Sequence, residues 1–427
     1  MSRLRKPSSR SSLLPPADYR RPLAAGVALF VASWLLLSYL PAFSVWLYGD
    51  VRFYENWGAM LAAHLVPYRD FRIEYPPGAM ITFLVPVYAR KLAGYHGTYY
   101  DWFRVEILVI GVLSLLVMAW ALAFLGASRR RAYAALCVAG IAPALLGPIA
   151  ISRYDYWPAL FAVAAVAALA ADRPAFACAL AAVGAVAKVY PAVIIPIALV
   201  ELWRHGGARA VARGAALAVV VAAALAAPLV AAGPSGVSWA LHRQLARPLQ
   251  VESLGAVFFA AAHVIANVHL HVVKSAGSDN LVGSGPSLAV TLSTVATLLA
   301  LLAVYALYAR SEGTREQLVA ACAAAVTAYI AFSKVFSPQY LVWLIPLVPL
   351  VGGRRGLRAG ALLVVVLGMT QIWEPYRYYD YYKHFAPWLT SLVVARDLLV
   401  VALFVVLALP LLRRNAEQLD PVRQTVV

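Results

Sequence analysis

The chain has 427 residues, of which 63% are hydrophobic and 13% are charged, and its mean hydropathy is +0.76. Soluble domains carry about a quarter charged residues, so this composition excludes an ordinary soluble protein and indicates a multi-pass membrane protein. The net charge of +17 would suggest a nucleic-acid partner in a soluble chain. Here the positions of the basic residues favour a different explanation, and we expect no nucleic-acid binding.

The apolar stretches predict about twelve membrane-spanning helices. A bilayer core about 30 Å thick needs roughly 20 apolar residues per helix. After a basic tail, residues 1–22, the first stretch is too long for the core of a cleavable signal peptide, and we expect none. We expect one all-α membrane domain over residues 23–412 and a tail over residues 413–427. The predicted spans are residues 23–47, 103–125, 132–149, 157–171, 174–187, 190–203, 214–232, 286–308, 317–332, 339–351, 357–373 and 388–412.

The charges on the loops predict the orientation. With the N-terminus in the cytoplasm, the cytoplasmic segments hold more than half of the 36 Lys and Arg residues but fewer than half of the 19 Asp and Glu residues. Short loops rich in Lys and Arg remain in the cytoplasm. We therefore expect both termini on the cytoplasmic side, and we interpret the net charge mainly as a topology signal. The three cysteines lie within apolar stretches without metal or disulfide spacing and should pack as small apolar residues.

The loops on the opposite side are long and hold most of the remaining carboxylates, histidines, tyrosines and tryptophans. Within them, residues 51–64, 78–92 and 256–268 mix apolar and polar side chains and are too short to span, which favours helices along the membrane surface. Because loops on a rigid scaffold often carry function, we expect the active site on the extracytoplasmic face. These loops are residues 48–102, 152–156, 233–285 and 374–387.

Asp50 stands at the outer end of the first predicted helix. A carboxylate at the lipid–water boundary is partly desolvated, which suits a general base that removes a proton from an attacking hydroxyl. The alternative is an ordinary helix-end carboxylate that is solvated or paired with Arg52.

Other outer motifs combine cations, carboxylates and aromatic rings, as a phosphate-bearing lipid headgroup and a sugar require. Lys188, Lys334 and Arg247 are candidates for binding the donor phosphate. Each motif also has a plainer interpretation, since lysines near helix ends can snorkel to the interface and tyrosines form interfacial belts. Candidate sugar or acceptor contacts are Glu252, Asp155, Gln339, Glu74, Tyr75 and His242.

In their order along the chain, these motifs resemble glycosyltransferase family 87. This family comprises multi-pass enzymes of the GT-C architecture and includes actinobacterial α-mannosyltransferases that depend on polyprenyl-phosphomannose. The resemblance covers residues 23–412 and is carried by GDVRFYENWG, PYRDFRIEYPPG, RYDYWPAL, KVYPAVIIP, RPLQVES and SPQYLVWLIPL.

The resemblance implies a GT-C fold in a bacterial plasma membrane and an inverting glycosyltransferase. It implies a polyprenyl-phosphate-sugar donor, with mannose as the expected sugar, and a glycolipid or glycan acceptor. Asp50 matches the catalytic aspartate in the first outer loop of this class. No second aspartate adjoins it, as in the metal-binding pattern of some GT-C enzymes, although Glu55 could substitute. We expect no obligatory metal and no other cofactor.

Two alternatives stay open. The same enzyme class could use arabinofuranose or glucose, which composition does not distinguish from mannose. A transporter or flippase of polyprenyl-linked sugars is the second, since such proteins carry ionisable groups near mid-membrane. Arg396 and Asp397 are the main charges inside a predicted span. As sequence neighbours they do not share a helix face, so we expect each to meet a different helix and to lock the packing.

Overall fold

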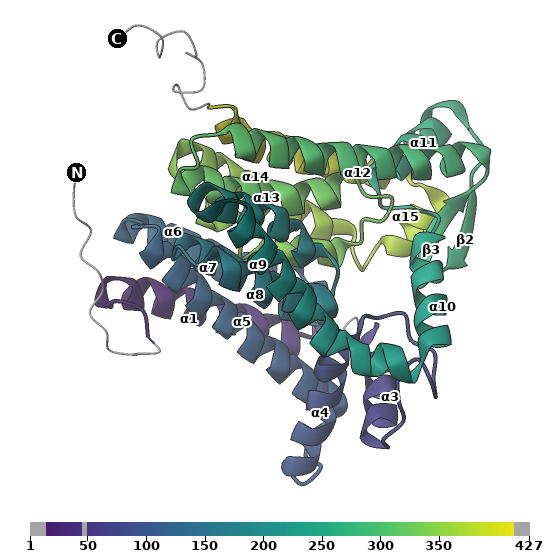
Figure 1. Ribbon diagram of the computed structural model, residues 1–427. Helices are drawn as coiled ribbons and strands as arrows, with labels where there is room; N and C mark the ends of the chain where they lie inside the picture. Colours follow the sequence, from purple (N-terminus) through teal and green to yellow (C-terminus); the bar gives the residue numbers. More distant parts are fainter. Residues whose placement is uncertain (1–13, 45–48, 414–427) are drawn as a thin grey trace, which may run out of the picture.

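The computed structural model describes residues 14–44 and 49–413 and is largely helical (Figure 1). Residues 1–13 of the predicted N-terminal tail, residues 414–427 of the predicted C-terminal tail, and residues 45–47 of the first predicted span lie outside these ranges. Within them, six helical elements are long and apolar enough to cross a membrane, which supports an all-α membrane protein. They are α1 (Ala17–Tyr39), α5 (Tyr99–Phe124), η3 (Tyr190–Ile194) with α9 (Ile195–Ala232), α12 (Ser284–Arg310), α14 (Gly353–Trp373), and α16 (Pro387–Ala408) with η6 (Leu409–Leu412).

Four shorter helices pack among these six. They are α6 (Arg129–Leu146), α7 (Tyr156–Ala170), α8 (Pro174–Ala187) and α13 (Arg315–Phe332). Helix α13 is buried along nearly its whole length, because its many alanines let neighbouring helices approach closely. The cysteines are free, and Cys178 and Cys322 are buried, as expected of small apolar residues.

Close packing of α1 against α6 depends on two glycines. A Cβ atom on Gly140 would lie 2.4 Å from the carbonyl oxygen of Gly26, so no side chain fits there. About two turns further along α1, the Ser33 hydroxyl donates to the carbonyl of the same Gly140 at 3.1 Å. The helix backbones therefore meet directly, as in other membrane helix pairs with small residues at the crossing.

Helix α9 is two helical arms joined at Gly207. This glycine has a φ of +61°, a left-handed conformation that glycine adopts without steric cost. A Cβ atom on Gly214 would lie 2.2 Å from Leu202 Cδ1, so the second arm packs back against the first. The stretches predicted as separate helices, residues 190–203 and 214–232, thus correspond to the two arms.

The helix predicted for residues 339–351 is wrong. This segment forms two 3₁₀ turns, η4 (Pro338–Trp343) and η5 (Val348–Leu350), because Pro338, Pro346 and Pro349 remove the amide donors that an α-helix needs. Its apolar side chains are almost all buried. Irregular backbone at membrane depth is tolerated where protein covers it, and this explains why an apolar but proline-rich stretch is not a helix.

The long loops fold into a separate layer of short elements. The segments predicted as surface helices are helical: residues 51–64 contain α3, residues 78–92 contain η1 and α4, and residues 256–268 contain most of α11. The sequence did not indicate the antiparallel sheet, which has the strand order β1-β3-β2. The elements of this layer are α2 (Pro41–Ser44), α3 (Val51–Ala62), η1 (Pro77–Ala79), α4 (Met80–Leu92), η2 (Pro148–Ala150), α10 (Pro234–Leu245), β1 (Leu249–Gln250), α11 (Leu254–Ala266), β2 (His271–Ser275), β3 (Ser278–Val282) and α15 (Tyr378–His384).

The arginine-rich loops meet at one end of the bundle and the long loops at the other. Arg315 pairs with Asp172 at 3.1 Å, and Arg204 donates to the carbonyl of Ser311 at 3.0 Å. The start of α1 and the end of η6 also lie at this end, on the left in Figure 1, whereas α3, α4, α10 and the strands lie on the right. The predicted separation of the two classes of loop is therefore present in the fold.

Candidate active site

Asp50 lies at the start of α3 and is held by Arg153, which follows η2. The Asp50 Oδ2 atom is 3.1 Å from Arg153 Nε, and the same Nε donates to Gln339 Oε1 at 3.1 Å. The partner of Asp50 is therefore Arg153 and not Arg52. Gly49 allows this contact, since a Cβ there would lie 2.9 Å from Arg153 Nη1. About a third of the Asp50 side chain (35%) is exposed.

Asp155 and Lys188 form a second ion pair beside the first. Asp155 Oδ1 accepts from Lys188 Nζ at 2.6 Å and from the indole Nε1 of Trp343 at 2.6 Å. Lys188 Nζ also lies 4.9 Å from the ring centre of Tyr154 and 5.2 Å from that of Tyr340. Burial lowers the pKa of Lys188, and the Asp155 carboxylate opposes this. Lys188 is thus enclosed by aromatic rings and does not snorkel.

The two ion pairs belong to one electrostatic cluster. Lys188 interacts with Asp50 and Arg153 as well as with Asp155. Gln339, which contacts Arg153, belongs to η4. Its Oε1 atom also accepts a hydrogen bond from the hydroxyl of Ser337, the residue before η4, at 3.1 Å. Segments from three distant parts of the chain therefore place two carboxylates and two cations together. Of the residues in and around this cluster, the sequence predicted Asp50, Asp155, Lys188 and Gln339 as site residues.

Glu374 joins this cluster, and sequence reasoning missed it. It directly follows α14 and is half-buried. Burial raises the pKa of Glu374 to about 7, while Arg153 partly offsets this and Asp50 adds to it. A carboxylate next to the outer end of a span is the signal that singled out Asp50, and it applies equally to Glu374. Arg153, although recognised at an outer helix end, was also given no role.

Arg247 and Lys334 form a separate cationic group near the small sheet. Arg247 Nη2 donates to Ser278 Oγ at 3.0 Å, and Lys334 Nζ donates to the carbonyl of Leu245 at 2.6 Å. Burial and the nearby Arg247 lower the pKa of Lys334. Tyr340 interacts electrostatically with both Arg247 and Asp155, so it links this group to the Lys188 cluster.

Glu252 is part of the protein interior. It accepts a hydrogen bond from Gln250, and its carbonyl accepts one from Arg396 Nη2 at 2.9 Å. Burial raises the pKa of Glu252 well above its usual range, Glu374 adds to this, and Arg396 opposes it. The neutral form is therefore favoured, and the contacts seen here anchor the loop before α11.

Three predicted site residues remain, namely Glu74, Tyr75 and His242, and they differ in what they contact. Glu74 pairs with Arg243 of α10, the residue after the predicted His242. His242 is exposed, and among the residues that the structure describes its imidazole has no hydrogen-bond or ion-pair partner. Tyr75 packs edge to face against Tyr154, with ring centres 5.4 Å apart. Tyr75 therefore forms part of the wall beneath Asp50, and His242 stands apart.

The prediction for Arg396 and Asp397 is wrong in one respect. Both side chains are buried in α16, but they contact each other, with Arg396 Nε 2.7 Å from Asp397 Oδ1. The long guanidinium bends back to its neighbour while its Nη2 reaches Glu252, and the ring of Phe336 lies 4.2 Å from its charge centre. The pair thus locks packing, as expected, but as one unit.

Comparison of the chain with models of known protein families finds no match, and comparison with curated proteins finds none either. Between residues 14–44 and 49–413, no three side chains of His, Cys, Asp or Glu come together as metal ligands would. The predicted site residues Asp50, Asp155 and Lys188 thus lie in one cluster with Arg153 and Glu374.

Proposed function

We propose that the protein is an inverting glycosyltransferase that transfers a sugar, mannose in the first instance, from a polyprenyl phosphate to a glycolipid or glycan acceptor. The observation that carries this proposal is the position of Asp50. Its Oδ2 atom contacts Arg153 at 3.1 Å, about a third of its side chain (35%) is exposed, and Lys188 lies within electrostatic reach. A reachable carboxylate beside fixed cations is what sugar transfer from a phosphate requires. The family resemblance of the motifs supports the same reaction.

In the proposed reaction, Arg153 orients Asp50, whose carboxylate accepts the proton of the acceptor hydroxyl. The acceptor oxygen attacks the anomeric carbon as the bond from that carbon to the phosphate oxygen breaks. The electron pair leaves with polyprenyl phosphate, whose negative charge Lys188, Lys334 and Arg247 stabilise. In-line displacement inverts the anomeric carbon, so a β-linked donor gives an α-linked product.

We further propose that the site faces the extracytoplasmic side of a bacterial plasma membrane and that the fold is of the GT-C type. The arginine-rich loops gather at the end of the bundle away from Asp50, and such loops remain in the cytoplasm. The exposed apolar surfaces of α5, α12 and α16 offer a path for the isoprenoid tail.

The test is sugar transfer by purified protein from synthetic polyprenyl-phosphate mannose to a panel of glycolipids. Asp50→Asn should lower transfer by roughly 10²- to 10⁴-fold, because it removes the general base, while donor binding stays within a few-fold. Asp380→Asn is the matched control. Asp380 is an aspartate of the same layer, 4.0 Å from Arg377 and outside the cluster, and its variant should transfer normally.

Unchanged transfer by Asp50→Asn would remove Asp50 from the chemistry. If mannose fails with every acceptor, the arabinose and glucose donors distinguish the sugar. If all donors fail while labelled polyprenyl-linked sugar crosses proteoliposome membranes, the protein is a transporter and the enzyme proposal is overturned.

A further inference from the structure

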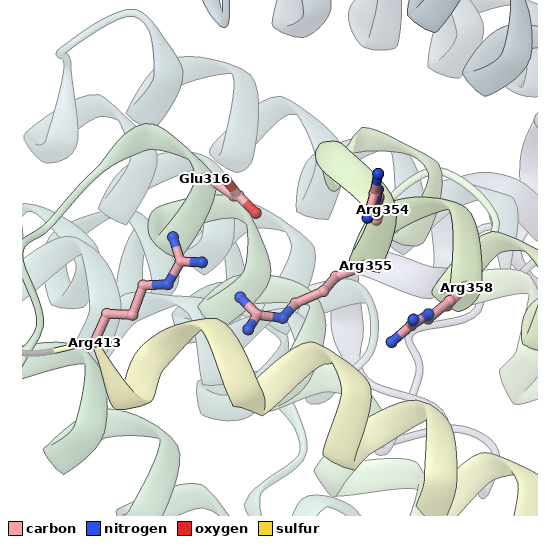
Figure 2. Close-up of a pocket in the computed structure, with 5 residues that line it drawn as sticks. All are labelled: Glu316, Arg354, Arg355, Arg358 and Arg413. Carbon is pink, nitrogen blue, oxygen red and sulfur yellow. The ribbon is translucent and has the colours of Figure 1, made fainter.

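A second charged site lies at the opposite end of the bundle from Asp50. Figure 2 shows a cavity there whose lining side chains come from three elements, namely the start of α13, the first two turns of α14 and the residue after η6. Its volume is about 290 Å³, well above the roughly 10–15 Å³ that one water molecule occupies on this measure. The lining residues are Glu316, Arg354, Arg355, Arg358 and Arg413.

The cavity has an unbalanced positive charge. Its lining has four arginines and one carboxylate, and the side chains of Arg355, Arg413 and Glu316 point toward the same space (Figure 2). Among the residues that the structure describes, none of the four arginines forms an ion pair. Gathered like charges repel each other, so this arrangement is favourable once an anion enters.

Other arginines at this end of the bundle lie outside this cavity, so a cytoplasmic location alone does not require arginines to come together. Arg315 and Arg204 are satisfied by a carboxylate or carbonyl oxygens. Arg209 and Arg213 are exposed on α9 and do not line this cavity. The positive-inside rule depends on how many basic residues the loops carry and not on their meeting in one cavity. The four cavity arginines therefore need a further explanation.

The surface next to the cavity is apolar and exposed. Arg354, Arg358, Ala361 and Val365 follow each other at intervals of three or four residues, so they share one face of α14, and all four are exposed. On the neighbouring α16–η6 segment, Leu412 precedes Arg413 and is 56% exposed. A cationic cavity next to an exposed apolar helix face suits a molecule with an anionic group and apolar chains better than it suits a free ion.

We propose that this cavity binds the headgroup of an anionic phospholipid of the bilayer. The phosphodiester lies between the arginines of α14 and Arg413, and the acyl chains lie along the exposed faces of α14 and α16. The site is independent of the sugar-transfer site, because it lies at the other end of the bundle and shares no residue with it.

The test measures phosphatidylglycerol binding to the full-length protein in detergent, by native mass spectrometry and by the shift in Tm. Arg354→Gln/Arg358→Gln should weaken binding roughly 10- to 30-fold, since each arginine near an anionic lipid contributes about a tenfold or smaller factor. Arg209→Gln/Arg213→Gln is the matched control, with the same spacing, charge change and exposure, and should bind like wild type. Phosphatidylcholine and inorganic phosphate should bind much more weakly.

Three outcomes would overturn the proposal. The first is equal retention of phosphatidylglycerol by both double variants. The second is binding of inorganic phosphate as tight as that of the lipid, which would indicate a free-anion site. The third concerns the chain's own acidic residues Glu417 and Asp420. If the wild-type protein does not bind the lipid but the Glu417→Gln/Asp420→Asn variant does, the C-terminal tail is the occupant.

Discussion

Asp155 is completely buried, and its charge is balanced by Lys188 and the indole of Trp343. Removing one partner of a buried pair leaves an uncompensated charge, which costs about 3–5 kcal/mol. Lys188→Met and Asp155→Asn should each destabilise the protein by about this amount. The double variant should lose clearly less than the sum of the two, because neither charge is left alone.

Unfolding of the four proteins of this cycle in detergent measures the coupling. The matched control is the largely exposed pair Arg69–Asp70, whose atoms are 2.9 Å apart and whose variants should add without measurable coupling. Additive losses for Lys188 and Asp155 would show that the two charges do not depend on each other.

Glu374 gives the stability of the protein a pH dependence of known sign. Its pKa is raised from 4.5 to about 7 by burial, so the folded state binds its proton more tightly than the unfolded state. The stability that Glu374 contributes is complete below about pH 4.5 and is lost as the pH rises through about 7. Glu374→Gln should therefore raise Tm by a few degrees relative to wild type at pH 8, and hardly at all at pH 5.

Melting curves of the two proteins between pH 5 and 8 test this. Glu312→Gln, at an exposed position between α12 and α13, should leave the difference from wild type the same at every pH. A Glu374→Gln effect of equal size at pH 5 and pH 8 would mean that Glu374 stays charged in the folded protein.

At the scale of elements, the crossing of α1 and α6 has no space for a methyl group. A Cβ on Gly140 would lie 2.4 Å from a backbone oxygen, whereas a Cβ on Gly360 of α14 would meet nothing within 4 Å. Gly140→Ala should destabilise the protein by about 1–3 kcal/mol through overpacking. Gly360→Ala should be neutral or slightly stabilising, because alanine is the better helix former.

The comparison uses the same substitution in two apolar helices, so thermal unfolding of both variants isolates the contact. Identical Tm values would show that α1 separates from α6 without cost.

The accuracy of the element predictions follows from how local each signal is. Helices such as 214–232 and 357–373 were predictable because a long apolar stretch is itself the physical cause of a membrane helix. The segment 339–351 has the apolarity but also contains two prolines and directly follows a third, Pro338, and proline chemistry overrides hydropathy there. Strands β2 and β3 are five residues each and partly polar, so no local pattern distinguishes them from a loop.

The site was predictable only in part, for the same reason. Asp50, Asp155 and Lys188 stand at helix ends, which the sequence reveals. The contact of Asp50 with Arg153, and that of Trp343 with Asp155, join residues far apart in the chain. Such contacts depend on how helices pack, and without that packing Arg52 was as good a partner for Asp50 as Arg153.

At the scale of the whole molecule, the two ends of the bundle carry different chemistry. One end holds carboxylates and cations in pairs, and the other holds four arginines in a cavity without paired carboxylates. An assay that follows sugar transfer and one that follows lipid binding therefore report on separate sites, and variants at one end should leave the other unchanged.

The contact of Arg396 with the carbonyl of Glu252 has a consequence for the order of synthesis. Glu252 precedes α11 in the layer of long loops, but the side chain that holds it belongs to α16, the last long helix. While α16 is still inside the ribosome, the nascent chain therefore lacks this hydrogen bond, and the loop that carries Arg247 and Glu252 has no contact with α16. The charge cluster around Asp50 likewise lacks Glu374 until α14 has been synthesised, so both groups of charges are complete only late in translation.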